Sequence, residues 1–183
     1  MNHLLDDIQT WAQELGATHA RVVTDRAVLV PQDVVREACL QNSCGSSGRC
    51  WTCPPDVGEL ADLAPVLAGC ADFVVVQSIT QLEDSWDFEG AKQAAVDHNT
   101  RLRDLRRRLA AEYPGSEVLV LGCGGCGFCA SCTCPDAPCR FPAEALSSVE
   151  AYGLDVKALL ESVDLSYVNG KGTVSYVGAV LVC

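Results

Sequence analysis

Apolar residues recur at helical spacing in two long segments of the chain. Over residues 4–15 the apolar side chains fall on one face of a helix, and a glycine ends the run. A second helix is predicted over residues 89–113, where Pro114 and Gly115 end it. Within that helix, residues 101–109 carry leucines on one side and arginines on the others. This basic run favours a solvated helix face or, alternatively, a docking patch for an acidic redox partner.

Short runs of Val, Leu, Ile and Ala predict strands between the helices. The predicted strands are residues 20–23, 27–30, 73–79, 117–121 and 173–182, and shorter helices are predicted over residues 57–69 and 155–162, with a further helical stretch after Pro142. Strands that alternate with helices are typical of an α/β (or α+β) fold, a layered sheet with helices. No internal repeat and no low-complexity linker divides the sequence, so we expect one domain over residues 1–183.

The charge of the chain narrows the classes of partner. Thirteen Lys and Arg residues against 24 Asp and Glu residues give a formal net charge of −11. Nucleic-acid-binding surfaces are basic, so this balance argues against a nucleic-acid partner. A chain of 183 residues buries about 70% of its unfolded surface and needs no disulfide bonds to fold.

No segment has the pattern of an export signal or a membrane span. The first residues are acidic, and no basic segment followed by an apolar run is present there. The longest apolar stretches, near residues 73–76 and 174–183, fall short of the ~20 apolar residues that span a bilayer. We therefore expect a cytoplasmic protein with no membrane partner.

Twelve cysteines are the most unusual feature of the composition. Ten of them lie in two patches, at residues 39–53 and 123–139: Cys39, Cys44, Cys50 and Cys53 in the first, and Cys123, Cys126, Cys129, Cys132, Cys134 and Cys139 in the second. Clustered cysteines in a cytosolic chain of domain size indicate metal ligands or redox groups rather than a disulfide framework. Cys70 and Cys183 are expected to be a core cysteine and a terminal one, since a free cysteine behaves as a small hydrophobe.

The second patch has the spacing of an iron–sulfur site. Cys126, Cys129 and Cys132 recur every third residue, and Cys139 follows at a distance. Three thiolates at this spacing reach three irons of one 4Fe–4S cluster, and a fourth thiolate must come from farther along the chain. The glycines between them let backbone N–H groups approach the cluster sulfides.

The four thiols of the first patch are enough for a second 4Fe–4S cluster. Cys53 precedes Pro54 and Pro55, and a cysteine followed by proline recurs beside iron–sulfur clusters. A ligand can also cross between the patches, as in two-cluster ferredoxins. Alternatively, Cys39 packs at a helix end and the other three are loop thiols.

Zinc is the main competing metal. Zinc sites usually use two separated pairs of cysteines or mixed Cys/His sets. His3, His19 and His98 lie outside both patches, which disfavours a mixed set. A zinc knuckle that pairs Cys50 and Cys53 with two cysteines of the second patch is an open alternative.

The second patch and the residues after it resemble a known family. The segment Cys126-x2-Cys129-x2-Cys132-x6-Cys139-Arg-Phe-Pro142, followed by Ser148-Val-Glu-Ala-x-Gly-x-Asp-Val156, is similar to the DUF2284 family, predicted metal-binding, cysteine-rich proteins of archaea and anaerobic bacteria. The element from Cys44 through Gly48 to Cys53 resembles that family's first cysteine motif. The resemblance implies iron–sulfur or other metal binding in an anaerobe. Cys50, Cys123 and Cys134 are additional to the family's cysteines.

We therefore interpret the chain as a single iron–sulfur domain that binds two 4Fe–4S clusters, or one larger cluster, and transfers electrons to a partner redox enzyme. The predicted ligands are Cys126, Cys129, Cys132 and Cys139 for one cluster and Cys39, Cys44, Cys50 and Cys53 for the other. The surplus thiols Cys123 and Cys134 leave room for a redox enzyme with an atypical cluster and an open site. A zinc-stapled interaction domain and a cluster carrier are further alternatives, and the sequence identifies no catalytic residue.

Overall fold

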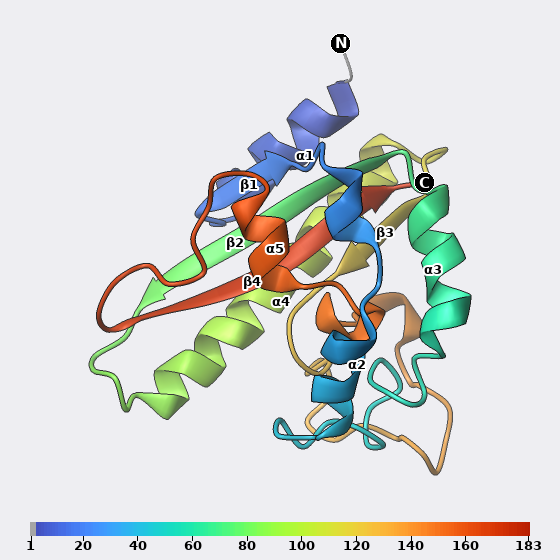
Figure 1. The fold of residues 1–183 in the computed structure, drawn as a ribbon, viewed down its shortest axis with the longest axis vertical. Helices are drawn as coiled ribbons and strands as arrows, with labels where there is room; N and C mark the ends of the chain where they lie inside the picture. Colours follow the sequence, from blue (N-terminus) through green and yellow to red (C-terminus); the bar gives the residue numbers. More distant parts are fainter. Residues whose placement is uncertain (1–2) are drawn as a thin grey trace.

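A computed structural model describes residues 3–183 of the chain (Figure 1). Four strands form one sheet in the order β1-β2-β4-β3, and every neighbouring pair is antiparallel. The strands are β1 (His19–Val22), β2 (Asp72–Gln81), β3 (Val118–Leu121) and β4 (Thr173–Val182). The fold is therefore α+β, because no parallel pair with a helical crossover is present in the described residues.

One face of the sheet is covered by the two amphipathic helices that the apolar spacing predicts. They are α1 (His3–Glu14) and α4 (Phe88–Glu112). Ile8 of α1 and the leucines Leu102 and Leu105 of α4 pack with Val74 and Val180 of the central strands. The apolar stripe on each helix thus forms the core on this side of the sheet.

Shorter elements cover the opposite face. They are the 3-10 turns η1 (Arg26–Leu29) and η3 (Glu150–Tyr152) and the helices α3 (Leu60–Gly69) and α5 (Val156–Glu161). Phe73 and Leu181 of the sheet pack here with Leu67 and Leu159. A further helix, α2 (Asp33–Leu40), lies against η3.

Two predicted elements differ from the structure. Residues 27–30, predicted as a strand, form η1, because the Asp25 side chain accepts a hydrogen bond from the Ala27 N–H and starts a turn. The helical stretch expected after Pro142 is reduced to the 3-10 turns η2 (Pro142–Glu144) and η3. Between those turns the chain runs beside Gly122, which donates to Ser147 O and accepts from Val149 N.

Cys70 and Cys183 were expected to be unpaired, and the structure corrects this prediction. Their sulfur atoms form a disulfide across a sequence separation of 113 residues. The pairing follows from the sheet register, because Asp72 lies opposite Val182 where β2 begins and β4 ends. The disulfide therefore closes the end of the sheet where the chain terminates (Figure 1).

Both cysteine patches lie at the other end of the molecule. α2 ends at Leu40 and leads into the first loop, and β3 ends at Leu121 and leads into the second. Figure 1 shows the two loops together at its lower edge, below α2. Among the described helices, none combines the length and apolar character needed to cross a bilayer.

His98 gives the fold a predictable dependence on pH. It lies fully buried on α4, where Nδ1 is 2.9 Å from Ser78 Oγ and where, within residues 3–183, Nε2 has no hydrogen-bond partner. Burial and, to a lesser degree, the charge of Arg101 lower the pKa of His98 from 6.5 to about 3. Below pH 6.5 the His98 imidazole therefore binds a proton in the unfolded chain but not in the folded one. The free energy of unfolding consequently falls as the pH drops from 6.5 towards 3.

We predict that replacing His98 with Gln removes this contribution. Between pH 8 and pH 5.5 the native chain should lose roughly 1.4 kcal/mol of unfolding free energy that His98→Gln does not lose. Urea unfolding of both proteins at the two pH values measures the difference. An equal loss in both would show that His98 does not set this dependence.

Candidate metal centre

The two cysteine loops pack against each other although some eighty residues separate them. Trp51 donates from Nε1 to the carbonyl oxygen of Ala137 at 3.0 Å, and the Cys134 thiol donates to Asp56 Oδ2 at 3.3 Å. Gly125 lies so close to Ser46 that a Cβ atom at position 125 would be 2.7 Å from Ser46 Oγ. The loops therefore form one unit rather than two separate appendages.

Asn99 of α4 fixes the start of the second loop. Its Nδ2 donates to the Cys123 carbonyl at 2.9 Å, and its Oδ1 accepts from the Cys123 N–H at 3.0 Å. A Cβ atom on Gly122 would lie 2.3 Å from the same Oδ1, so this close approach requires glycine. Asn99 of α4 therefore sets the direction in which the loop leaves β3.

Five thiols line one small cavity of about 40 Å³, which we call the five-cysteine pocket. They are Cys50, Cys126, Cys129, Cys132 and Cys139, and the cavity is also lined by Trp51, Phe128 and Phe141. The spacing of the sequence grouped Cys50 with the first patch, whereas the structure places it with the second. The aromatic side chains limit access of water to the pocket.

Cys50 lies between the two patches. Its thiol is 3.2 Å from Thr52 Oγ1 and also contacts the Cys53 thiol and the backbone N–H of Cys126. The hydrogen bond with the Cys53 thiol, helped by those from Thr52 and Cys126, lowers the pKa of Cys50 to about 4. The same contact, together with burial, raises the pKa of Cys53. The contact therefore makes Cys50 the more acidic thiol of the pair.

Arg103 brings a positive charge to the five-cysteine pocket. It is 4% exposed, and its Nη2 donates to the Cys126 carbonyl at 2.5 Å and lies 3.6 Å from the Cys126 sulfur. Its Nε donates to the Glu144 carbonyl at 2.9 Å, and its guanidinium lies 5.1 Å from the centroid of the Phe128 ring. A fixed guanidinium at this position offsets negative charge on the sulfurs.

The rest of the basic run on α4 also makes defined contacts. Arg106 donates to the Ala145 carbonyl, Arg107 pairs with Glu144, and Arg108 pairs with Glu14 and lies over Trp11. Part of the helix face that was predicted to be solvated is therefore paired with carbonyl groups, carboxylates and an aromatic ring. The sequence does not distinguish Arg103 from the other arginines of this run, because its burial depends on the cysteine loop that packs against it.

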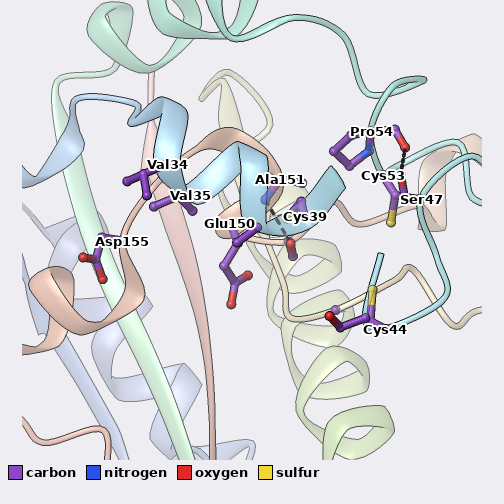
Figure 2. Close-up of a pocket in the computed structure, with 14 residues that line it drawn as sticks. Val34, Val35, Cys39, Cys44, Ser47, Cys53, Pro54, Glu150, Ala151 and Asp155 are labelled. Carbon is purple, nitrogen blue, oxygen red and sulfur yellow. Dashed lines mark hydrogen bonds between the residues drawn. The ribbon is translucent and has the colours of Figure 1, made fainter. Parts of the chain in front are cut away.

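A second, larger cavity of about 520 Å³ holds the remaining thiols of the first patch, and we call it the three-cysteine cavity (Figure 2). Cys39, Cys44 and Cys53 line it, together with residues of α2 and η3. Figure 2 shows the Cys44 and Cys53 side chains directed toward one another, and the Glu150 side chain apart from them with its carboxylate directed away from both. Cys39 lies at the end of α2, close enough to Cys44 and Glu150 for their charges to act on it.

Glu150 has an unsatisfied oxygen in this cavity. Its Oε2 atom is buried and, within residues 3–183, has no hydrogen-bond partner. Burial raises the pKa of Glu150. Burial also raises the pKa of the Cys39 thiol, and the charges of Glu150 and Cys44 add to this rise. No sequence pattern singles out Glu150, since an isolated glutamate is usually a surface residue.

The two surplus cysteines line neither of these cavities. Cys123 is buried against α4, with its sulfur 3.9 Å from the Ala95 carbonyl, and burial raises the pKa of its thiol to about 12. Cys134 is held by its hydrogen bond to Asp56. Within residues 3–183, no three His, Cys, Asp or Glu side chains converge as ligands of a single metal ion. The assignment of ligands therefore stays a prediction.

The fold and the two cavities define a class, an α+β protein with thiol-lined sites in loops that follow α2 and the edge strand β3 of an antiparallel sheet. The chain belongs to the DUF2284 family, described as predicted metal-binding proteins, whose family model matches residues 22–182. This match covers nearly the whole chain and confirms the resemblance seen in the cysteine motifs. No curated protein and no solved structure matches the chain.

Proposed function

We propose that the protein is an electron carrier that binds a 4Fe–4S cluster in the five-cysteine pocket. The observation that carries the proposal is that five thiols, from segments far apart in the sequence, line one pocket beside the buried Arg103. Sulfur ligands without oxygen or nitrogen partners suit iron–sulfur clusters and zinc. The triplet Cys126, Cys129 and Cys132, with Cys139 following, is the pattern that favours the cluster.

In this proposal Cys126, Cys129, Cys132 and Cys139 are the ligands, and each must lose its proton for a metal to bind. When bound, the cluster supplies a one-electron redox couple. Arg103 stabilises the additional negative charge that arrives with the electron. Phe128 and Phe141, whose rings lie 5.3 Å apart, line the pocket beside the thiols.

A complete set of thiolates fits a carrier rather than a catalyst. One electron comes from a reduced donor protein and leaves to an oxidised acceptor, and no bond in this chain forms or breaks. Cys50 contacts Cys126 on one side and Cys53 on the other, so its sulfur joins the pocket to the three-cysteine cavity.

The proposal is tested by removing two ligands at once, because a single loss leaves four thiols in the pocket. The double variant Cys129→Ala/Cys132→Ala retains only three and should lose about four iron atoms per chain. Cys123→Ala/Cys134→Ala is the matched control, since both of its cysteines belong to the same loop but lie outside the pocket.

Iron analysis and low-temperature EPR of the reduced proteins measure the outcome. We expect the control variant to keep the iron content of the native chain and the first variant to lose one EPR signal. Equal iron content and identical spectra in the two variants would contradict the assignment. Bound zinc in place of iron would identify a zinc-stapled domain instead.

A further inference from the structure

Cys50 and Cys53 form a Cys-x2-Cys pair that remains when a cluster takes its four ligands from the second loop. Both side chains are buried, with 7% and 6% of their surface exposed. Two cysteines at this spacing are typical of pairs that alternate between a dithiol and a disulfide. The geometry of the pair and its surroundings support this chemistry.

The backbone brings the two cysteines within disulfide distance. The Cys53 N–H donates to the Cys50 carbonyl at 2.9 Å, which closes a four-residue turn. The Cα atoms at the ends of such a turn lie less than about 7 Å apart, and disulfides join Cα atoms that are about 4.4–6.8 Å apart. The two thiols are hydrogen-bonded to each other, and Thr52 Oγ1 bonds with both sulfurs. A disulfide can therefore form without a change in the course of the loop.

The turn is held in place by hydrogen bonds on the side of Cys53. The Pro54 carbonyl accepts from the Gly48 N–H and from Ser47 Oγ, each at 2.9 Å. The Cys53 carbonyl accepts from the Val57 N–H at 3.0 Å. These bonds fix the backbone on both sides of the Pro54 ring, so the Cys53 sulfur keeps its position beside Cys50.

The two sulfurs differ in access. Cys50 lines the five-cysteine pocket of about 40 Å³, whereas Cys53 lines the three-cysteine cavity of about 520 Å³. Sites for small molecules usually measure about 300–1,000 Å³, so the cavity has the size of such a site and the pocket does not. An outside molecule therefore reaches the Cys53 sulfur, and Cys50 lies behind it.

We propose that Cys50 and Cys53 are a redox-active pair that undergoes thiol–disulfide exchange with a small neutral thiol or disulfide in the three-cysteine cavity. The Cys53 sulfur attacks one sulfur of a disulfide RS–SR, so that a Cys53–SR bond forms, the S–S bond breaks and RSH leaves. The Cys50 sulfur then attacks Cys53, which forms the Cys50–Cys53 disulfide and releases a second RSH. Two electrons pass from the pair to RS–SR, and the two thiol protons leave on the two RSH molecules.

The lining of the cavity indicates the charge of that molecule. The acidic residues Glu150 and Asp155 line it, and no Lys, Arg or His is present among its described lining residues. A negatively charged thiol or disulfide would therefore meet negative charge without a compensating cation. Apolar groups from Val34 and Val35 form part of the wall. The cavity thus fits a small neutral compound with an apolar body.

The test treats the natively purified, oxygen-free protein with the disulfide of mercaptoethanol, a small neutral disulfide. Remaining thiols are then alkylated, and tryptic peptides are mapped by mass spectrometry. Because trypsin cleaves after Arg49, a Cys50–Cys53 disulfide lies within one peptide, whereas a Cys44–Cys53 disulfide joins two. We expect the first. Alkylation of both Cys50 and Cys53, or a bond from Cys53 to Cys44, would overturn the inference.

Two variants test the order of the steps. Cys50→Ser should stop the reaction at the mixed disulfide, so that a mercaptoethanol group stays on Cys53. Cys44→Ser is the matched control, since it removes a thiol from the same cavity but outside the pair, and it should still form the Cys50–Cys53 disulfide. A Cys50→Ser protein that carries no mercaptoethanol on Cys53 would contradict the assignment of Cys53 as the attacking sulfur.

A second disulfide of similar size tests the role of the cavity. The disulfide of mercaptoacetate has carboxylates in place of the hydroxymethyl groups, and we expect it to oxidise the pair several-fold more slowly. The comparison is made at high salt, which screens exposed charges more than partly buried ones. Equal rates would overturn entry through the cavity.

The fate of this inference is separate from that of the electron-carrier proposal. A Cys50–Cys53 disulfide in a chain that binds no iron would support the inference and contradict the carrier. Bound iron without formation of the disulfide would have the opposite meaning.

Discussion

Replacing Gly178 with Ala should destabilise the protein by about 3 kcal/mol, because the centre of the sheet has no room for a side chain there. A Cβ atom at this position would lie 2.6 Å from the Leu121 carbonyl oxygen and 2.4 Å from Leu102 Cδ1. The carbonyl belongs to the backbone of the neighbouring strand, so β3 or β4 must shift. For a chain of this size the loss corresponds to a fall in Tm of roughly 6–12 °C.

The same substitution should also weaken metal binding. Leu121 is the last residue of β3, and the second cysteine loop follows it directly. A displacement of Leu121 therefore moves the start of that loop against Asn99. We expect Gly178→Ala to bind less iron than the native chain under equal reconstitution. Gly115→Ala is the matched control, since a Cβ there meets nothing within 4 Å, and its Tm and iron content should equal those of the native chain.

Calorimetry and iron analysis of the two glycine variants measure these effects. A Gly178→Ala protein as stable as Gly115→Ala would contradict the close packing of β3, β4 and α4 described above. Lowered stability with normal iron content would show that the strand packing does not set the position of the loop.

Replacing Arg103 with Gln should cost about 3 kcal/mol of stability and alter the redox site. Arg103 is 4% exposed and donates to the carbonyls of Cys126 and Glu144, so its loss leaves two buried acceptors without their charged donor. The contact with the Phe128 ring is lost as well. Chemical denaturation measures the stability change.

The redox consequence of Arg103→Gln has a definite sign. A positive charge beside Cys126 favours the reduced, more negative state of a bound cluster. Removing it should therefore lower the reduction potential, which EPR-monitored titration measures. Arg107→Gln is the matched control on the same helix, because Arg107 makes ion pairs with Asp104 and Glu144 at the surface. Equal potentials in the two variants would contradict a role for Arg103 at the cluster.

The sequence predicts the main elements of the fold where hydrophobic periodicity is long. The strand over residues 173–182 coincides with β4, and the helix over residues 89–113 differs from α4 by one residue at each end. Short apolar runs are less informative, because four such residues suit a strand or a turn equally. Residues 27–30 became η1 since the Asp25 side chain, rather than the apolar run, determines the local backbone.

Sequence spacing identifies which cysteines are chemically important but not how they are grouped. The triplet Cys126, Cys129 and Cys132 lies in one pocket, as its regular spacing indicates. Cys50 joins that pocket because the loops pack through Trp51 and Ala137, a contact between positions 86 residues apart. The disulfide of Cys70 and Cys183 depends likewise on strand register, which the composition of the two segments does not contain.

The burial of two charged residues near the cavities likewise could not be predicted from the sequence. Arg103 lies in a run of arginines, and the other arginines of that run are more exposed than Arg103. Glu150 lies among residues that form a 3-10 turn. Burial of either charge depends on which segments surround it, so the residue type alone favours a surface position. Arg103 contacts the Cys126 sulfur, and the charge of Glu150 helps to raise the pKa of the Cys39 thiol.

Metal and sulfide analysis of the natively purified protein tests the central claim most directly. The protein is prepared without oxygen, and iron, acid-labile sulfide and zinc are counted per chain and compared with the EPR spectrum of the reduced state. We predict about four iron and four sulfide atoms per chain for a cluster in the five-cysteine pocket, with the EPR signal of a reduced 4Fe–4S cluster. One or two zinc atoms per chain, with no visible absorbance and no sulfide, would contradict the account.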